Sequence, residues 1–189
     1  LYDGARLVLA NNIDSWAQLY TGGRHRGTSN SVTGYGHLKF KHISFNKYDN
    51  GWNRYLYEVP YMRLADIYLM YAEAVNEAYG PTGKAPGGIS AIEAVNIVRN
   101  RATLPDVDPR YYTSKEKFRE FLYDERAVEL AFESHRWYDI RRWYVGHLPK
   151  YTDKYIADMD ADHTYFNRVL YTKRVHDEKH YWLPLPIDQ

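Results

Sequence analysis

The sequence lacks cysteine altogether, so disulfide bonds and thiolate metal sites are excluded within its 189 residues. It also lacks an apolar run near the ~18 residues that a membrane-spanning helix needs. Its first four residues, Leu-Tyr-Asp-Gly, resemble neither an initiator segment nor a signal peptide, and we expect the chain to be the interior of a longer protein. A dominant charge is missing too, because 25 basic and 24 acidic residues leave a net charge of +1. This balance argues against a nucleic-acid-binding stripe and against a broad attraction to anionic lipid.

Aromatic residues, by contrast, are abundant. Tyrosine occurs 20 times, and aromatic residues make up 16% of a chain that is 44% apolar and 26% charged. The balance of apolar and charged residues is that of a folded globular protein. The tyrosines therefore need a role in the core or on a binding surface.

The stretch 60–80 (PYMRLADIYLMYAEAVNEAYG) predicts a buried helix around which the chain is organised. It is apolar nearly all round, which is typical of a helix in a protein interior. Pro60 suits a first helical turn, and Gly80 followed by Pro81 suits a left-handed cap and a stop. On a 100° wheel, one face consists of Leu64, Ile67, Tyr68, Tyr71, Val75 and Ala78, and the other side carries Met62, Leu69 and Met70.

A second helix is predicted after the glycine- and proline-rich loop 80–88. Ser90 and Glu93 have the spacing of a capping box that opens a helix ending near Ala102. The loop makes these two helices antiparallel neighbours, an arrangement that suits helix pairs of the tetratricopeptide kind.

A third helix is predicted from a second capping box, Thr113 with Glu116, to about Phe132. A short helix or turn then covers 135–143. These elements make the chain mainly α-helical.

The N-terminal part, 1–36, shows no sustained period and is predicted to form surface loops. Partly alternating apolar residues in 37–45 and 54–59 flank Asn50 and Gly51, a dipeptide preferred in tight hairpin turns. We therefore expect one small β-hairpin there.

The C-terminal part after Gly146 is polar and tyrosine-rich, and we predict a long irregular segment over 147–180. The apolar tail 181–187 is expected to dock on the helices. Two regions result, a loop-rich segment 1–59 with the hairpin and a helical region 60–189.

Two glutamates of the third predicted helix lie on its apolar face. Glu125 and Glu129 fall inside the stripe formed by Phe118, Leu122, Val128 and Phe132. An unpaired buried carboxylate would cost several kcal/mol, so cationic partners are needed. Arg99 lies on the inward face of the second helix, and arginine suits bidentate pairing. We predict a structural ion-pair network of Arg63, Arg99, Glu125, Glu129 and Arg136, with Arg101, Arg141 and Arg142 as further candidates.

The alternative is that Glu125 and Glu129 are the acid and base of a glycosidase. Their Cβ atoms, one helical turn apart, would lie about 6 Å from each other, which is compatible with a retaining enzyme. A general acid needs a raised pKa, however, whereas neighbouring arginines lower the pKa of a carboxyl. This argument favours the structural interpretation.

Three motifs together resemble the C-terminal part of SusD/RagB-type outer-membrane nutrient-binding proteins. They are residues 60–74 (PYMRLADIYLMYAEA), Asn96-x-x-Arg99-x-Arg101-Ala102, and residues 125–143 (ERAVELAFESHRWYDIRRW). Thr33-Gly34-Tyr35 and the late Leu185-Pro186-Ile187 also fit, although Leu185 departs from the usual Pro-Ile-Pro. The resemblance covers residues 33–189 well and the first 30 poorly.

The resemblance implies a SusD-like α-helical fold with tetratricopeptide-like helix pairs and long irregular loops. It also implies a non-catalytic, glycan-binding lipoprotein on the surface of the outer membrane. Such proteins form the lid of a SusC-like TonB-dependent transporter in polysaccharide uptake, and they are held by a lipidated N-terminal cysteine that this chain lacks. A helical-repeat module that binds a peptide or protein remains the alternative.

Glycan binding calls for exposed aromatic rings beside hydrogen-bonding side chains. The irregular segments provide this chemistry, and we nominate Trp16, Tyr20 and Trp52 as ligand-binding residues, with Tyr35 as a further loop aromatic. Packing against the protein body is the competing role for each ring. For Tyr151, Tyr155, Tyr165 and Phe166, packing is the favoured role, because a long irregular segment needs anchors.

No motif indicates a metal or another cofactor. His176 and His180 are four residues apart, but Asp177 stands where the metalloprotease pattern has glutamate, and no helical period surrounds them. We expect a solvated loop there, and neither a nucleophile elbow nor a phosphate-binding glycine loop is present.

Overall fold

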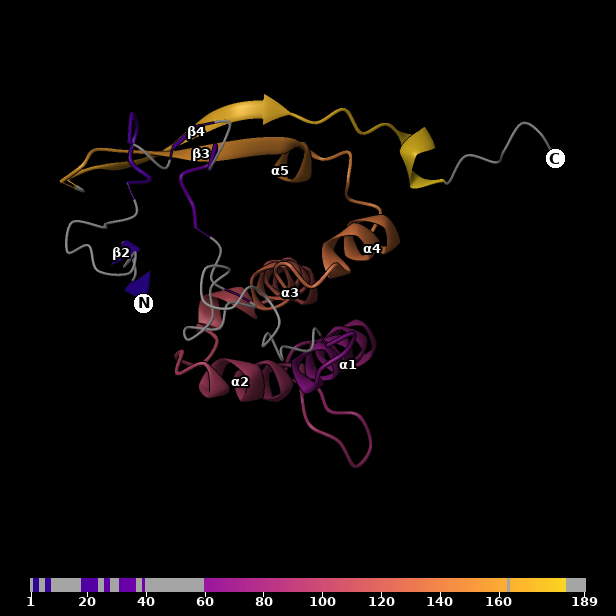
Figure 1. Ribbon diagram of the computed structural model, residues 1–189. Helices are drawn as coiled ribbons and strands as arrows, with labels where there is room; N and C mark the ends of the chain where they lie inside the picture. Colours follow the sequence, from indigo (N-terminus) through magenta and orange to yellow (C-terminus); the bar gives the residue numbers. More distant parts are fainter. Residues whose placement is uncertain are drawn as a thin grey trace. The chain divides into compact units, whose positions relative to one another are not determined.

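The computed structural model describes residues 2–3, 6–7, 18–23, 26–27, 31–36, 39, 60–162 and 164–182 (Figure 1). Two compact units divide the chain. The helical unit is Val59–Asp139, and the hairpin unit combines Leu1–Glu58 with Ile140–Gln189. The described residues are mostly helical with one long antiparallel hairpin, which confirms the predicted fold class.

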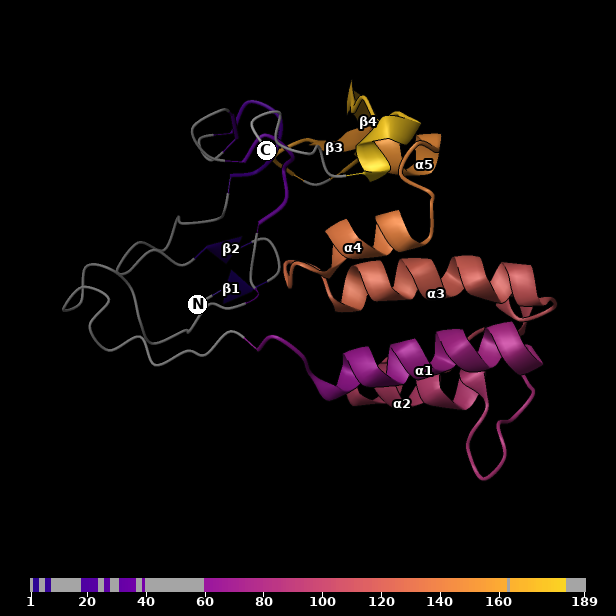
Figure 2. The same cartoon turned by 90° about the vertical axis from the view of Figure 1, so that its right-hand side faces the viewer.

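The helical unit is built on three helices that lie side by side, α1 (Leu64–Tyr79), α2 (Ala91–Arg101) and α3 (Lys115–Glu129) (Figure 2). A short 3₁₀ helix, η1 (Pro109–Tyr111), precedes α3. Small side chains on α1 and α2 allow these helices to approach closely, and aromatic and branched side chains from α3 fill the space between them. The buried core contains Leu69, Ala72, Val75, Ala91, Ala94, Val95, Val98, Val107, Phe118 and Leu122.

Burial on α1 does not follow one side of the wheel, since Val75 and Leu69 from different sides are both buried. Leu64 is 66% exposed and Ile67 is 42% exposed, whereas Ala65, Asp66, Leu69, Ala72, Val75 and Asn76 are buried. A helix that is apolar nearly all round has no clear direction on a wheel, so polar contacts decide which side turns inward. The buried Asn76 donates from Nδ2 to the backbone oxygen of Lys115 at 3.1 Å.

The ends of α1 fit the sequence at one side only. Gly80 caps its C-terminus with φ 79°, a conformation that suits glycine, and its N–H bonds the Asn76 oxygen at 2.9 Å. The helix begins at Leu64, with Arg63 as N-cap, so Pro60 is not in its first turn.

The predicted start of α2 is confirmed, and that of α3 is off by one residue. Glu93 N–H donates to Ser90 Oγ at 3.2 Å, and Ser90 N–H donates to the Glu93 carboxylate at 2.7 Å, which completes the capping box. The N-cap of α3 is Ser114, which accepts from Lys117 N–H at 3.3 Å, rather than Thr113.

The end of α3 also differs from the prediction. The helix stops at Glu129, and Phe132 has a φ of 64° and is 70% exposed. Val128 is 77% exposed, so neither residue belongs to the inward stripe. The chain turns here to begin α4 (His135–Arg142), within which the boundary between the two units falls.

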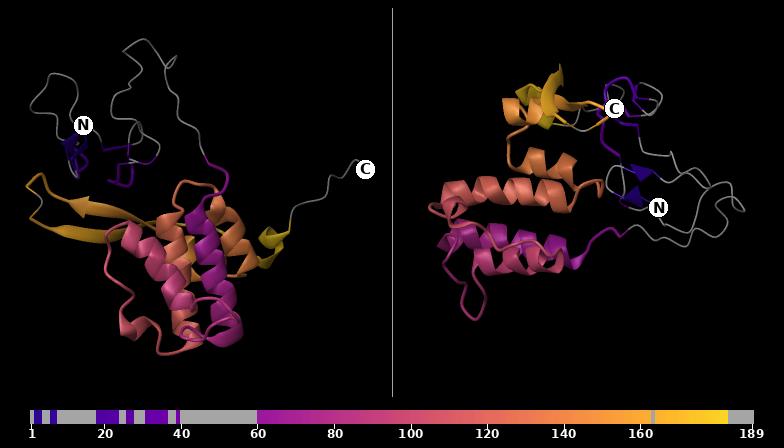
Figure 3. Two further views of the ribbon diagram at one scale, coloured as in Figure 1. Left: turned by 90° about the horizontal axis from the view of Figure 1, so that it is seen from below. Right: turned by 90° about the vertical axis from the view of Figure 1, so that its left-hand side faces the viewer.

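The hairpin unit contains α5 (Pro149–Thr152) followed by two long antiparallel strands, β3 (Asp153–Met159) and β4 (Phe166–Lys173) (Figure 3). A bulge interrupts their register between Lys154 and Tyr155. A 3₁₀ helix, η2 (Glu178–Tyr181), follows, and β1 (Tyr2–Asp3) pairs with β2 (Arg6–Leu7).

The prediction of an irregular segment over 147–180 was therefore wrong. All eight residues of β4 are exposed, so the strand lacks the alternation of apolar and polar residues that reveals a half-buried strand. The bulge further breaks the period of two. The hairpin predicted around Asn50-Gly51 lies outside the described residues, and so does most of the tail 181–187.

Described parts of the N-terminal loops lie along the outer edge of β3. Thr21 N–H donates to the Met159 oxygen at 2.9 Å, and Ala157 N–H donates to the Thr33 oxygen at 2.9 Å. Thr21 Oγ1 also donates to Asp158 Oδ1 at 2.6 Å. Two loop segments are thus fixed to the hairpin by backbone bonds.

Candidate functional site

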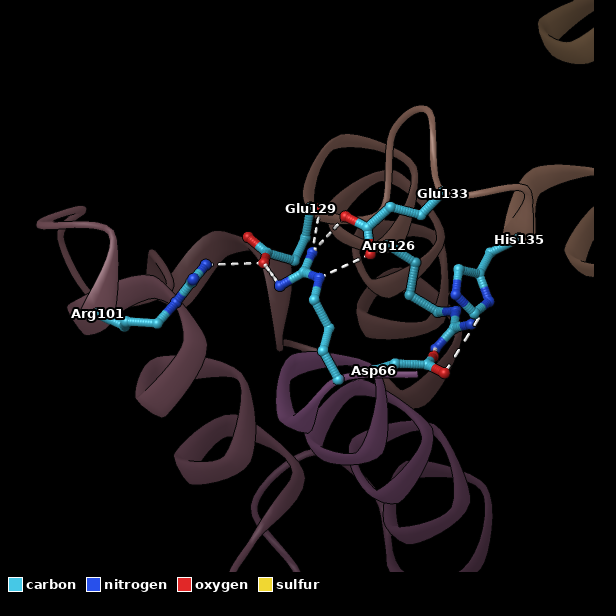
Figure 4. A network of polar contacts seen from close by, with 7 residues as sticks. Asp66, Arg101, Arg126, Glu129, Glu133 and His135 are labelled. Atoms are coloured by element: carbon cyan, nitrogen blue, oxygen red, sulfur yellow. Dashed lines mark hydrogen bonds and ion pairs between the residues drawn. The ribbon is translucent and has the colours of Figure 1, made fainter. Parts of the chain in front are cut away.

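A buried arginine of the helical unit, Arg126, is held by two aspartates, one of which, Asp66, is drawn with it in Figure 4. Arg126 donates from Nη1 to Asp66 Oδ1 at 2.8 Å, and from Nε and Nη2 to the two Asp139 oxygens at 3.1 and 3.2 Å. The three side chains are 3%, 3% and 5% exposed. His135 Nδ1 lies 3.9 Å from Asp66 Oδ2. This triad joins α1, α3 and α4, because each helix supplies one of its members.

A second arginine site lies just before α1. Arg63 donates from Nε and Nη2 to the two Glu133 oxygens at 2.6 and 2.9 Å, and from Nη1 to Glu129 Oε1. Glu129 also accepts from Arg101 Nη2 at 2.7 Å (Figure 4). Burial lowers the pKa of Arg63, but its hydrogen bonds to Glu133 and Glu129 outweigh burial and raise that pKa overall.

The third pair joins α2 to α3. Arg99 Nη1 donates to Glu125 Oε2 at 2.8 Å, and Arg99 Nε donates to the Pro105 oxygen at 2.8 Å. Burial raises the pKa of Glu125, although the charge of Arg99 and its hydrogen bond oppose this, and the Glu129 charge adds to the rise. Arg99 thus lowers the pKa of Glu125 as expected, but the expectation that arginine decides the net direction was wrong, because desolvation exceeds the attraction.

Four of the five residues predicted for the ion-pair network contact one another in two sets, Arg63 with Glu129 and Arg99 with Glu125. Arg136 lies exposed at the start of α4, and its place in the network stays a prediction.

The prediction missed Arg126, which is buried and pairs with two aspartates. Its position was visible in principle, because Phe118, Leu122 and Arg126 follow one another at intervals of four residues along one side of α3. Its partners could not be read in the same way, since Asp66 is 60 residues away.

The geometry of Glu125 and Glu129 suits a scaffold better than acid–base chemistry. Their side chains are 14% and 15% exposed, and each is hydrogen-bonded to arginine. A general acid must hold its proton toward a substrate, whereas these oxygens accept from guanidinium groups. Among the described residues, no three histidines, aspartates or glutamates are grouped so that they could hold a metal ion.

Among the described helices, none is long and apolar enough to cross a membrane. Of the nominated ligand-binding residues, Trp16 and Trp52 lie outside the described residues. Tyr20 is half-buried, directly before the residue that bonds to Met159 on β3.

The hairpin unit carries a further set of aromatic rings, which we call the hairpin aromatic surface, made of Tyr35, Tyr155 and Phe166 with Arg168. Tyr35 is 57% exposed and Phe166 is 58% exposed, and their ring centroids lie 6.4 Å apart in an edge-to-face arrangement. Arg168 lies over the Tyr155 ring at 4.0 Å. The register puts Tyr155, Phe166 and Arg168 on one face of the hairpin. Phe166 is thus exposed rather than a packing anchor, whereas Tyr151 is buried.

Comparison with known proteins identifies the family. The model of the SusD family matches residues 12–189, so the chain belongs to the SusD family. The match includes the helical unit, with its arginine–carboxylate contacts, and the β3–β4 hairpin.

Individual relatives agree with this assignment. The chain is 43% identical over 84 residues to SusD-like protein P25 of Formosa agariphila and 37% identical over 90 residues to SusD-like protein P2 of the same organism. These matches cover 44% and 45% of this chain but 15% and 17% of the relatives. The crystal structure of a SusD-like protein from Bacteroides fragilis matches with a TM-score of 0.53 and 35% identity, over 68% of this chain and 23% of that one. The chain thus spans less than a quarter of the length of these relatives.

Proposed function

We propose that the chain is part of a cell-surface protein that binds glycans for uptake through a TonB-dependent transporter and that does not catalyse their cleavage. The observation that carries this proposal is the match to the SusD family over residues 12–189. In this proposal the protein sits on the outer membrane beside a SusC-like transporter and is attached by a lipid anchor outside this chain.

The different side chains of the two units support a binding role. In the helical unit, arginines engage the carboxylates of Glu125, Glu129 and Asp66, which stabilises the framework. In the hairpin unit, exposed rings lie beside hydrogen-bonding groups such as Arg168. Sugar rings stack on aromatic faces and hydrogen-bond at their edges, so this surface has suitable chemistry.

We infer that aromatic residues of the loops and the hairpin contact the glycan. The candidates are Trp16, Tyr20 and Trp52 from the sequence, and Tyr35 and Phe166 of the hairpin aromatic surface. The bond that Thr21 N–H donates to β3 and the bond that the Thr33 oxygen accepts from β3 hold the loops of Tyr20 and Tyr35 against this strand, which reduces the conformational entropy lost on binding.

The test is a screen of the full-length protein against several polysaccharide classes, by affinity electrophoresis and calorimetry. We expect affinity for at least one class, reduced about tenfold by Tyr35→Ala or Phe166→Ala, the loss typical of a truncated aromatic anchor. Tyr79→Ala removes a 53% exposed ring from α1 in the helical unit and serves as the matched control. An absence of binding in every class would refute the glycan assignment.

The same samples distinguish the alternatives. A glycosidase would release reducing ends, and Glu125→Gln or Glu129→Gln would abolish turnover with little change in melting temperature. We expect no reducing ends, and for Glu129→Gln a loss of stability, because two arginines contact that carboxylate. Capture of peptides in preference to glycans would instead favour a helical-repeat module for protein ligands.

A further inference from the structure

The chain around η2 returns to the turn that follows α4, within the hairpin unit. The Tyr181 ring stacks on Tyr144 with centroids 4.2 Å apart. The Tyr181 hydroxyl accepts from the backbone N–H of His147 at 3.1 Å and also lies 2.7 Å from the ring nitrogen Nδ1 of His147. Arg141 Nη2 donates to the His180 carbonyl oxygen at 3.0 Å. Segment 176–181 is thereby held by residues more than 30 positions earlier.

At the start of η2, Asp177 and His180 form a reciprocal pair of hydrogen bonds. The backbone N–H of Asp177 donates to the ring nitrogen Nδ1 of His180 at 2.8 Å, while the backbone N–H of His180 donates to the backbone oxygen of Asp177 at 3.0 Å. In a capping box a glutamate or glutamine three residues on accepts this first bond. Here imidazole replaces it, and imidazole can accept at Nδ1 only while that nitrogen carries no proton.

Two further imidazoles, those of His176 and His147, lie at this contact. Both ring nitrogens of His176 are buried and have no hydrogen-bond partner among the residues that the structure describes, and the ring packs so closely on Gly146 that a Cβ there would lie 2.7 Å from Nε2. The rings of His176 and His180 are 5.7 Å apart. At His147, the Tyr181 hydroxyl can donate a hydrogen bond to Nδ1 when that nitrogen carries no proton.

Charged groups around His180 come from both segments that meet here, the chain around η2 and the end of α4. Arg141, which donates to the His180 carbonyl oxygen, and Lys179 are the cations there. Asp177 is paired with Lys179 at 3.6 Å, and Glu178 accepts a hydrogen bond from Tyr144, so both carboxylates are already engaged. Together with burial, the Glu178 charge raises the pKa of Tyr144, which keeps that hydroxyl a donor.

We propose that His180 is a pH-sensitive latch, whose protonation breaks the bond from Asp177 N–H and releases segment 176–182 from the turn after α4. A protonated ring places an N–H against the Asp177 N–H, so the bond is lost and the two donors repel. The bonds from Arg141 to the His180 oxygen and from His147 to the Tyr181 hydroxyl depend on the conformation of η2. They are therefore lost if η2 opens when the bond from Asp177 N–H breaks.

Hydrogen exchange with mass spectrometry on the full-length protein tests the latch, with rates corrected for the intrinsic pH dependence of exchange. Protection of peptides covering 176–182 should fall about fivefold or more between about pH 8 and about pH 5, the range in which imidazole titrates. His180→Gln keeps an acceptor at both pH values and should retain protection at the acid pH.

His135→Gln, which changes a histidine of the helical unit, is the matched control and should leave the pH response of 176–182 as in the wild type. His180→Glu provides a second acceptor variant, which is still mostly ionised at about pH 5, and should also retain protection. Equal protection of the wild-type segment at both pH values would overturn the proposal, as would loss of protection at acid pH in both acceptor variants.

Discussion

Arg126 shows most clearly how single residues hold the helical unit together. Its guanidinium is almost fully buried, and two aspartates from other helices neutralise it. A buried ion pair adds little beyond what apolar residues could provide, but removal of one partner leaves a charge in the core. The triad therefore ties the fold to one arrangement of α1, α3 and α4.

Replacement of Arg126 should be among the most damaging single changes in this unit. In Arg126→Met, Asp66 and Asp139 lose the buried guanidinium that they share, and we expect the free energy of unfolding to fall by about 3–5 kcal/mol. Arg110→Met is the control, since Arg110 is 72% exposed and its pair with Asp108 contributes under about 1 kcal/mol. Urea denaturation followed by circular dichroism measures both, and similar losses in the two variants would contradict the structural role of the triad.

Two carboxylates should respond to pH with opposite sign. The hydrogen bond from Lys84, followed by those from Ser90, lowers the pKa of Glu93 from 4.5 to about 2. Its ionised form thus adds stability above pH 4.5, and this stability is lost as the pH falls toward 2. For Glu125, burial raises the pKa in the folded state, so its contribution is largest below 4.5 and declines as the pH rises through the folded pKa.

The measurement is the free energy of unfolding as a function of pH for the wild type, Glu93→Gln and Glu125→Gln. Glutamine keeps a hydrogen-bonding side chain at both positions and removes the charge together with its titration. The deficit of Glu93→Gln relative to the wild type should shrink toward pH 2. The free energy of unfolding of the wild type should fall relative to that of Glu125→Gln as the pH rises. If the two variants differ from the wild type with the same pH dependence, the opposite pKa directions of Glu93 and Glu125 are refuted.

At the scale of elements, local signals located the helices but not their orientation. The box of Ser90 and Glu93 marked the start of α2, because a cap involves only residues within one turn. The start of α3 was misplaced by one residue, since Thr113 and Ser114 are both good caps and the backbone beyond them decides between the two.

This difference gives a matched pair of substitutions. Ser114→Ala removes the acceptor of Lys117 N–H and should cost about 1 kcal/mol of stability. Thr113→Ala changes an exposed side chain one residue earlier and should cost about 0.5 kcal/mol or less. Thermal and chemical denaturation of the two variants check this, and a larger loss for Thr113→Ala would place the cap where the sequence pattern alone put it.

The β3–β4 hairpin marks the opposite limit of local signals. An exposed strand such as β4 has no buried face, so its sequence carries no period to read. Its pairing with β3 arises from backbone hydrogen bonds, which any side chain permits, and the aromatic rings it displays gain their positions only from that register.

For the whole molecule, the family assignment and the proposed glycan role rest on different kinds of support. Membership of the SusD family follows from a match over residues 12–189. The bound ligand remains a proposal, because the chain spans only 15% and 17% of the two relatives described. The glycan screen and the test for reducing ends therefore need the full-length protein.

The sequence by itself determined the helical class, the extents of α1 and α2 to within a few residues, and the family, because periodicity, caps and motif order are local properties of the chain. It also named Arg63, Arg99, Glu125 and Glu129 as residues that need partners. Only the tertiary structure decided that α1 turns Asp66 inward, that Arg126 meets it from 60 residues away, and that burial outweighs Arg99 at Glu125. Such choices depend on which helices pack together and how much water they exclude, and no short stretch of sequence carries that information.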